Sequence, residues 1–328
     1  MRAQQITELS GPASALTLGD VPEPGATHPM TNAEGVVVDV RAAGVSFPEV
    51  LQTRGEYQIK PPLPFVPGSE VAGTVRSAPE GSGLQPGQRV AAFPGFGGFA
   101  EVAAADPGLV FPLPDRVGFE QGAALPMNYL TMHFALRRRG QLREGETVLV
   151  HGAAGGLGTA GIQLAKAYGA RVLAVVSSEG KGETARAAGA DEVVLADGFR
   201  DRVKELTGGR GVDIVADPVG GDRFTDSLRS LGREGRLLVL GFTGGEIPTV
   251  KVNRLLLNNV SVVGVGWGAF WTGDPGYVQE QWRDLQPLLE RGALDPVLGS
   301  VHDLADAAAA VTELDERRAT GKVLLRVR

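Results

Sequence analysis

Residues 147–177 carry the feature that most constrains the fold of this chain. An apolar run, TVLVHG, is followed by the glycine-rich turn AAGGLG, and GTAGIQLAKAYG then has the spacing of a helix that ends at Gly169. A second apolar run, RVLAVVS, closes the segment. Continuous apolar runs of this length are typical of buried parallel strands, so the segment predicts a strand–helix–strand unit of a parallel sheet.

The strand–helix alternation continues through EVVLAD, VDIVADPVGG and GRLLVLGF, and NVSVVGVGW at 259–267 supplies one more strand. This alternation predicts a doubly wound parallel sheet of α/β class. The preceding part of the chain differs, because sixteen of the 21 prolines lie in residues 1–126 among short β-rich runs. Short strands between turn signals predict a small barrel-like β domain. Helices near 277–291 and 303–314 and a strand at 322–327 are predicted for the tail.

Bulk properties exclude several classes of function. A length of 328 residues favours two domains, and a net charge of −6 argues against nucleic acid as the main partner. The chain has no run of about 20 apolar residues, so no membrane span is expected. The N-terminal MRAQQITELSG lacks the apolar core of a signal peptide, and we therefore expect a cytoplasmic protein. The absence of cysteine excludes disulfides and thiolate metal ligands.

The turn at 153–158 resembles the dinucleotide-binding fingerprint G-x-G-x-x-G, with Ala153 at the first glycine position. Glycine at the second position lets the backbone approach a pyrophosphate, and glycine at the third lets the helix pack closely. The backbone amides at the helix N-terminus then face the anion. The residues expected to bind the pyrophosphate are Gly155, Gly156, Leu157 and Gly158.

The end of the second strand bears on the choice of dinucleotide. NAD enzymes place a carboxylate there to bind the ribose hydroxyls. This chain instead has Ser177 and Ser178, followed by Lys181. Hydroxyls and a cation suit a 2′-phosphate, so NADPH is the expected cofactor. Glu179 is the competing feature, because its carboxylate would favour NADH if it faced the ribose.

The order of the parts resembles the medium-chain dehydrogenase/reductase superfamily, and within it the zinc-free quinone oxidoreductases, which are zeta-crystallin-like. The motifs that carry the resemblance are GVSFPEVLQTRGEYQIKPPLPFVPGSEVAGTV (44–75), ALPMNYLTMHFAL (124–136), VLVHGAAGGLG (148–158) and DPVGG (217–221). The resemblance implies a GroES-like, β-barrel-type catalytic domain over 1–126 and a Rossmann NADP(H)-binding domain over 127–264. A return segment over 265–328 would complete the catalytic domain.

No metal site is expected. Zinc alcohol dehydrogenases of the same superfamily carry Cys at the position that resembles Ser46 and His at the one that resembles Ser69, and serine does not replace these ligands. The histidines, which show no metal-ligand spacing, are His28, His133, His151 and His302. His133 and His151 are expected to be hydrogen-bonded structural residues. Without a Lewis acid, the chemistry has to suit an acceptor that is already electron-poor.

The resemblance places Tyr57 and Ser46 at the catalytic cleft. Tyr57 is expected to donate a hydrogen bond to the oxyanion that forms on the acceptor, with packing beneath the proline-rich loop as the alternative. Ser46 stands where many relatives have asparagine, which leaves substrate preference open. The residues implied to contact the cofactor are Asn128, Thr131, Gly241, Phe242, Val265 and Gly266 at the nicotinamide half, and Ser177, Lys181 and Arg318 at the 2′-phosphate. A solvated charge cluster is the alternative for Arg318.

These features predict a zinc-independent, NADPH-dependent reductase that transfers hydride to a quinone or an α,β-unsaturated carbonyl, both of them small electrophilic molecules. One alternative is a reductase of short enoyl-CoA thioesters such as acryloyl-CoA, for which the run Arg137-Arg138-Arg139 is the candidate basic patch. The other is an NADPH-binding protein without significant catalysis. The resemblance also implies a homodimer, in which the strand at 259–267 extends a shared sheet.

Overall fold

The computed structural model describes residues 1–26, 34–274 and 276–328, and the chain folds into two compact units. The first unit consists of Met1–Met127, Pro275–Glu290 and Leu298–Arg328, and the second of Asn128–Asp274 and Arg291–Val297. The second unit therefore runs past residue 264, because Phe270 packs on Phe134 within it, with ring centroids 4.9 Å apart. None of the helices in the described ranges is long and apolar enough to cross a membrane.

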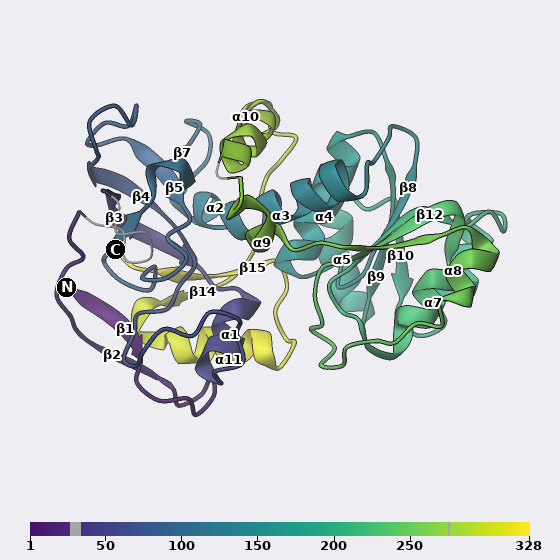
Figure 1. The fold of residues 1–328 in the computed structure, drawn as a ribbon, viewed down its shortest axis with the longest axis horizontal. Coiled ribbons are helices and arrows are strands. Elements are labelled where there is room, and N and C mark those ends of the chain that lie inside the picture. Colours follow the sequence, from purple (N-terminus) through teal and green to yellow (C-terminus); the bar gives the residue numbers. More distant parts are fainter. Residues whose placement is uncertain (27–33, 275) are drawn as a thin grey trace. The chain divides into compact units, whose positions relative to one another are not determined.

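The second unit is built on a parallel sheet with the strand order β10-β9-β8-β11-β12-β13 (Figure 1). Its strands are β8 (Thr147–Val150), β9 (Arg171–Val176), β10 (Glu192–Leu195), β11 (Val212–Asp217), β12 (Leu231–Val239) and β13 (Ser261–Gly264). From β8 the chain forms β9 and β10 towards one edge of the sheet. It then returns to the other side of β8 and forms β11, β12 and β13. The predicted doubly wound parallel sheet is confirmed.

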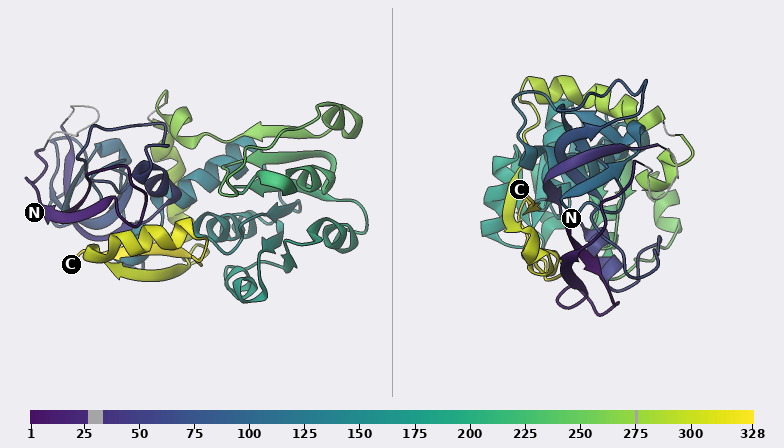
Figure 2. Two further views of the ribbon diagram at one scale, coloured as in Figure 1. Left: turned by 90° about the horizontal axis from the view of Figure 1, so that it is seen from below. Right: turned by 90° about the vertical axis from the view of Figure 1, so that its left-hand side faces the viewer.

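Helices lie on both faces of this sheet (Figure 2). The helical elements between residues 126 and 271 are η2 (Pro126–Leu130), α3 (Thr131–His133), η3 (Phe134–Arg139), α4 (Gly156–Ala167), α5 (Glu179–Ala187), α6 (Phe199–Leu206), η4 (Gly221–Arg223), α7 (Phe224–Arg229), α8 (Asn253–Asn258) and α9 (Trp267–Trp271). Apolar side chains of α6, α7 and α8 pack on the face that carries Leu149, Leu173 and Leu237. The helical run from Pro126 to Arg139 has π-helical turns on both sides of α3.

The first unit contains a seven-stranded, largely antiparallel sheet with the order β14-β15-β3-β4-β5-β7, to which β6 adds beside β3. Its strands are β3 (Val36–Gly44), β4 (Glu70–Ser77), β5 (Arg89–Ala92), β6 (Val102–Ala105), β7 (Val110–Pro112), β14 (Leu298–Asp303) and β15 (Lys322–Arg326); β1 (Arg2–Ile6) and β2 (Leu16–Asp20) form a separate antiparallel pair. This sheet is the predicted β-rich domain. Its helical elements are α1 (Phe47–Thr53), η1 (Pro107–Leu109), α2 (Phe119–Ala123), α10 (Gly276–Glu290), η5 (Leu304–Asp306) and α11 (Ala307–Asp315).

The last strand of the chain lies inside this sheet rather than at its end. Strand β15 pairs antiparallel with β3, with Leu324 opposite Gly44, and the Val45 N–H donates to the Val323 carbonyl at 2.9 Å. Gly44 has no room for a side chain, because a Cβ there would lie 2.5 Å from the Ala123 carbonyl and 2.7 Å from Cγ of Glu70. This pairing brings Lys322, at the start of β15, to the region where β3 ends and α1 begins.

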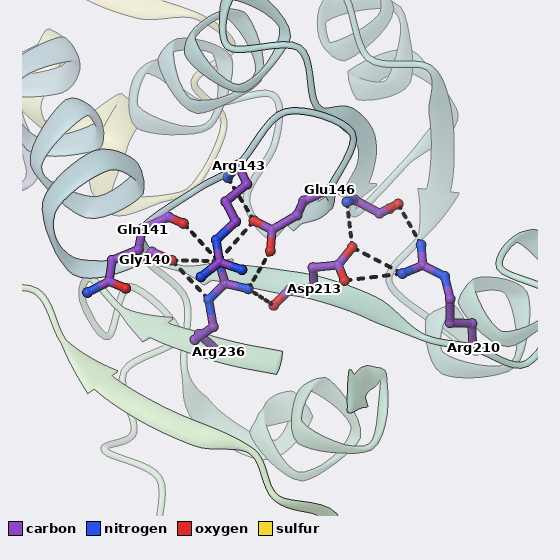
Figure 3. Close-up of polar contacts among 8 residues, drawn as sticks. Gly140, Gln141, Arg143, Glu146, Arg210, Asp213 and Arg236 are labelled. Atoms are coloured by element: carbon purple, nitrogen blue, oxygen red, sulfur yellow. Dashed lines mark hydrogen bonds and ion pairs between the residues drawn. The ribbon is translucent and has the colours of Figure 1, made fainter. Parts of the chain in front are cut away.

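At the amino ends of the central strands of the second unit, Arg236 holds several segments together (Figure 3). Its guanidinium donates to both carboxylate oxygens of Glu146 at 2.9 Å and to the Gly140 carbonyl at 2.6 and 2.9 Å. Both side chains are less than one-fifth exposed. Burial alone would raise the pKa of Glu146, but hydrogen bonds from Arg236 and from the Arg143 amide lower it below the ordinary value.

Replacing Arg236 with methionine should lower the free energy of unfolding by about 2–4 kcal/mol, because Glu146 and the Gly140 carbonyl lose a partly buried bidentate partner. Arg210→Met, in the same cluster, is the matched control. Arg210 pairs with Asp213 but is 59% exposed, and its loss should cost less than about 1 kcal/mol. Urea unfolding of both variants measures the difference, and equal losses would contradict the role of Arg236.

Candidate functional site

The carboxyl ends of the parallel strands in the second unit meet at one edge of the sheet. The strand order reverses between β8 and β11, and ligands of doubly wound sheets bind beside such a reversal, outside the carboxyl ends of the strands. The glycine-rich turn follows β8 directly, so it lies at this point. The predicted cofactor residues that follow strands at this edge are Gly155, Gly156, Leu157, Gly158, Ser177, Gly241, Phe242, Val265 and Gly266.

Gly155 and Gly158 of the turn differ in whether the fold itself requires a glycine at that position. A Cβ on Gly158 would clash with the Gly152 carbonyl and would lie 2.7 Å from Cα of Ala153, so the packing of the helix against the turn requires glycine. A Cβ on Gly155 would meet only the Gly152 carbonyl, at an ordinary 3.5 Å. Gly155 is the N-cap of α4 and has a φ of −81°, which any residue adopts. The protein itself therefore leaves the space beside Gly155 open, as the approach of a ligand to the backbone requires.

The loops after β11 and β12 are hydrogen-bonded to each other. The amides of Leu240, Thr243 and Gly244 donate to the carbonyls of Asp217, Pro218 and Val219, at 2.9, 3.1 and 2.8 Å. Oδ1 of Asp217 accepts from the amides of Val219 and Gly220, which folds DPVGG into a tight turn. A Cβ on Gly220 would lie 3.0 Å from the Phe242 ring, so the turn also positions this aromatic side chain.

The residues after β9 have separate roles. Ser178 is the N-cap of α5, where its hydroxyl accepts from the Lys181 amide at 3.5 Å. Glu179 has a side chain that is 75% exposed and lies 4.0 Å from Arg186, two helical turns further on. Ser177 is exposed at the end of the strand. The Glu179 carboxylate thus lies at the distance limit of an ion pair with Arg186 and stays largely exposed, and Ser177 follows the strand end.

Asn128 is buried and Thr131 half-buried on the helical run that opens the second unit. At the end of the same run, the guanidinium groups of Arg137 and Arg138 lie over the rings of Tyr168 and Phe270, 5.0 and 5.4 Å from the centroids. Arg139 donates to the Gly264 carbonyl at 2.9 Å. The three arginines of the basic run thus contact their own unit and remain exposed, and the enoyl-CoA alternative stays a prediction.

In the first unit, Ser46 belongs to a buried group of five side chains, which we call the serine–carboxylate cluster. Its members are Ser46, Glu49, Ser69, Glu70 and Lys322. The Lys322 ammonium donates to Ser46 Oγ at 2.6 Å and also to Glu70, while Ser46 Oγ donates to Glu70 at 3.0 Å. The second Glu70 oxygen accepts from the Met127 amide at 2.8 Å.

Glu49 forms the other half of the cluster. Its carboxylate accepts from the Ser46 amide at 2.8 Å, from the Ser69 amide at 3.0 Å and from Ser69 Oγ at 2.5 Å. Burial raises the pKa of Glu49 to about 7, although the Ser69 hydrogen bond and the charge of Lys322 act in the opposite direction. The buried ammonium thus bonds to Glu70 and not to Glu49, and Glu49 takes up a proton near neutral pH.

Tyr57 follows α1, and its pKa is raised by burial and by the negative charge of Glu49, which keeps the phenol protonated as a hydrogen-bond donor. Arg318, the predicted 2′-phosphate partner from the end of the chain, lies in the first unit. Its guanidinium is 60% exposed and pairs with Glu316 at 2.6 Å. Within that unit, the contacts of Arg318 are those of a solvated charge cluster, which is the alternative stated above for this residue.

Sequence reasoning missed Glu49, Glu70 and Lys322. One signal was available, because Ser46-Phe47-Pro48-Glu49 has the S-x-x-E spacing of a capping box, in which the acidic side chain bonds back to the N-cap amide. Lys322 gave no such signal, since a lysine at the start of an apolar strand is ordinary. Its partners lie more than 250 residues away in the sequence.

Three of the four histidines have protein contacts. The ring of His151 lies 2.8 Å from Ser227 Oγ and edge-on to Phe199, and burial lowers its pKa to about 4. His133 packs on Tyr168, and His302 pairs with Glu313 at 3.0 Å. His28 lies outside the described residues. Within the described ranges, no group of three or more metal-ligating side chains is arranged to hold a metal ion.

Because the folded pKa of Glu49 is about 7 against an ordinary 4.5, the native state holds a proton that the unfolded chain has released in this window. The free energy of unfolding should therefore fall as the pH rises from 4.5 to 7, by on the order of 3 kcal/mol in total, and then level off. Glu49→Gln should lose this slope, even if its stability is lower throughout. Glu56→Gln, at an exposed carboxyl beyond the same helix, is the control and should keep the wild-type slope. A Glu49→Gln slope equal to that of the wild type would contradict the prediction.

Comparisons with known proteins agree with this geometry. Family models for an alcohol dehydrogenase GroES-like domain and a zinc-binding dehydrogenase match residues 32–115 and 156–291. Quinone oxidoreductase-like protein 2 of Mus musculus is 39% identical over 99% of this chain and 91% of that protein. A probable oxidoreductase of Mycobacterium abscessus is 46% identical, with a TM-score of 0.89 and coverage of 100% of this chain and 99% of the other.

A further solved structure, the quinone oxidoreductase of Thermus thermophilus, described with its NADPH complex, is 37% identical with a TM-score of 0.85 and full coverage of both chains. The predicted GroES-like domain is confirmed by the first family model. The relatives extend over nearly the whole chain, and both family models occur in the predicted order. The chain therefore belongs to the quinone oxidoreductases of the medium-chain dehydrogenase/reductase superfamily.

Proposed function

We propose that this protein is an NADPH-dependent reductase of quinones or α,β-unsaturated carbonyl compounds. The observation that carries the proposal is the glycine turn at the reversal of the sheet, where Gly155 leaves open space that the fold itself does not need. Relatives of this chain are quinone oxidoreductases, and several were solved as complexes with NADPH. An NADPH-binding protein without catalysis is the alternative that the experiments below distinguish.

The residues at the carboxyl edge fit NADPH. The amides at the start of α4, beside Gly155, Gly156 and Leu157, would hold the pyrophosphate. Ser177 and Lys181 would hold the 2′-phosphate, since a hydroxyl and a cation suit this group. The loop residues Gly241, Phe242, Val265 and Gly266, together with Asn128 and Thr131, would line the nicotinamide half, and Arg318 is proposed as a further phosphate partner.

Bound NADPH supplies a hydride, which suits acceptors that are electron-poor without a Lewis acid. The chain's own contribution is to orient the acceptor and to stabilise the negative charge that develops on its oxygen. We assign this donation to the Tyr57 hydroxyl, which is protonated over the physiological range as phenols ordinarily are, and whose pKa burial and Glu49 raise further. Ser46 positions the cluster beside it, with its hydroxyl fixed between Lys322 and Glu70.

The two glycines of the turn give a matched pair of variants. Gly155→Ala should leave the free energy of unfolding within about 1 kcal/mol of wild type but weaken NADPH binding about tenfold or more, because the methyl group occupies the ligand's space. Gly158→Ala should lower the free energy of unfolding by about 1–3 kcal/mol or more, because it clashes with backbone. Fluorescence titration with NADPH and urea unfolding separate the two effects. Unchanged NADPH affinity in Gly155→Ala would argue against this binding site.

Loss of absorbance at 340 nm with quinones, simple enones and enoyl-CoAs tests the reaction, with NADPH and NADH in parallel and with and without EDTA. Rapid, EDTA-insensitive oxidation of NADPH by quinones or enones is the expected result. Tyr57→Phe should lower kcat/KM for the acceptor about 10- to 100-fold while the Kd for NADPH stays constant. Tight NADPH binding without turnover of any acceptor would contradict the reductase and favour an NADPH-binding protein without catalysis.

A homodimer is part of the proposal. Strand β13 is the last strand of its sheet, and such an edge can pair with an identical edge across a twofold axis. Four large apolar side chains just before it, Ile247, Val252, Leu256 and Leu257, are each at least 70% exposed. We propose that a second copy of the chain covers them.

Sedimentation equilibrium should give twice the chain mass for the wild type and a monomer for the double variant Leu256→Asp and Leu257→Asp. The double variant Glu183→Gln and Glu205→Gln, on exposed helix surfaces of the same unit, should stay dimeric. A monomeric wild type at micromolar concentration would refute this part of the proposal.

A further inference from the structure

A cavity of about 50 Å³ in the first unit is lined by Leu9, from the loop after β1, and by residues between 52 and 65. The two segments are joined by backbone hydrogen bonds. The Ile6 amide donates to the Phe65 carbonyl at 2.8 Å, and the Phe65 amide donates to the Ile6 carbonyl at 3.2 Å. The Leu9 side chain packs on Gly55, where a Cβ would lie 2.7 Å from Leu9 Cδ1. The cavity is therefore held by contacts within its own unit.

Most of the side chains around this cavity are apolar, among them Leu9, Ile59, Leu63 and Phe65. Leu9, Ile59 and Leu63 are between 43% and 52% exposed, although aliphatic side chains of this size are usually buried. They come from two segments that are far apart in the sequence, and the fold gathers them around one cavity. An apolar ligand group that enters the cavity and covers these side chains removes apolar surface from water on both partners.

Two polar residues that line the cavity do not oppose an apolar ligand. Both polar atoms of the Gln52 side chain are inaccessible to solvent, so they offer a ligand no contact. Lys60 is exposed, and a lysine side chain can cover apolar surface with its methylene groups while its ammonium stays in water. The cavity therefore suits an apolar group.

The size of the cavity favours an aliphatic chain over a ring. Sites for complete small molecules have volumes of several hundred Å³, so a ring system does not fit. One water molecule needs a cavity of about 10–15 Å³, and a methylene group is of similar size. The volume is therefore sufficient for a few methylene groups of a chain, and the rest of the chain would lie on Leu9 and Ile59.

Tyr57 connects the cavity to the proposed reaction, because it lines the cavity as well. Its hydroxyl, the proposed donor to the acceptor's oxygen, is no further from the cavity than the length of its own side chain. An acceptor bound at this hydroxyl can therefore extend a flexible substituent into the cavity. The rotatable bonds of such a substituent allow it to reach the cavity from more than one orientation of the acceptor.

We propose that this cavity is a subsite for an aliphatic chain of the acceptor, so that the protein selects quinones or enones that carry such a chain. The inference rests on the proposed reductase function and narrows its substrate class. Burial of one methylene group favours binding by up to about fourfold. Binding energy from a part of the substrate that does not react contributes to kcat/KM, so a chain of several methylene groups should raise kcat/KM markedly.

The test uses 1,4-benzoquinones with one unbranched alkyl substituent, from methyl through propyl and pentyl to heptyl. Their reduction potentials are nearly equal, because the length of an alkyl chain hardly changes its electronic effect. With NADPH, kcat/KM is measured for wild type, for the double variant Leu9→Gln and Ile59→Gln, and for Leu195→Gln, a similarly exposed leucine on β10. We expect a rise of about tenfold or more from methyl to heptyl in wild type and Leu195→Gln, and of less than about threefold in the double variant.

Calorimetric titration with 4-n-alkylphenols of the same chain lengths gives a second readout, because NADPH does not reduce them. Their affinity should rise with chain length in wild type and in Leu195→Gln but not in the double variant. Ile59→Leu, which keeps an aliphatic side chain, should retain the rise. If the unfolding midpoint shows that the double variant does not fold, the single variant Ile59→Gln replaces it.

A dependence on chain length that is lost only when the cavity residues are changed supports the subsite. The same dependence in all the variants, or none in wild type, would overturn it. If wild type reduces none of the quinones, the reductase proposal fails for quinones, and the alkylphenols alone then decide whether the cavity binds a chain.

Discussion

The ion pair between Lys322 and Glu70 is the interaction on which the first unit depends most. Both groups are nearly inaccessible, and removing charges from water is costly unless each has a partner. Here the ammonium on β15 is held by the carboxylate on β4 and by Ser46, so the end of the chain is joined to strands formed from its first quarter. Either residue alone would be a buried, unpaired charge, and the pairing of β15 with β3 supplies the geometry that avoids this.

One consequence concerns Glu49. The cluster contains two carboxyl groups and one ammonium, and the ammonium is taken by Glu70. Glu49 keeps only hydrogen bonds from Ser46 and Ser69, which do not offset its burial, and its pKa rises to about 7. Burial and the negative charge of the Glu49 carboxylate together raise the pKa of Tyr57. The network that holds α1 in place therefore also contributes to the raised pKa of the side chain proposed to act on the acceptor.

Local patterns account for much of the fold. The alternation of apolar runs with helices predicted the doubly wound sheet, because each strand and its helix are close in sequence and the connections follow one handedness. The glycine turn was recognisable for the same reason, since it lies between a strand and a helix that are themselves predictable. Helix α4 begins two residues earlier than expected, at Gly156, because the last glycines of the turn form its first turn. The contacts of Arg137 and Arg138 with Tyr168 and Phe270 could not be predicted in the same way, because no local pattern relates these residues.

The sequence by itself determined the order of the two kinds of domain, the glycine turn and the candidate residues at strand ends, because these depend on contacts between near neighbours. Only the tertiary structure decided which glycine serves the fold and which leaves space for a ligand, since that depends on the Gly152 carbonyl and the Ala153 backbone in three dimensions. The serine–carboxylate cluster is a second feature that only the tertiary structure decided. The S-x-x-E spacing signals Glu49 alone, whereas Lys322 and Glu70 are far apart in the sequence and only folding brings them together.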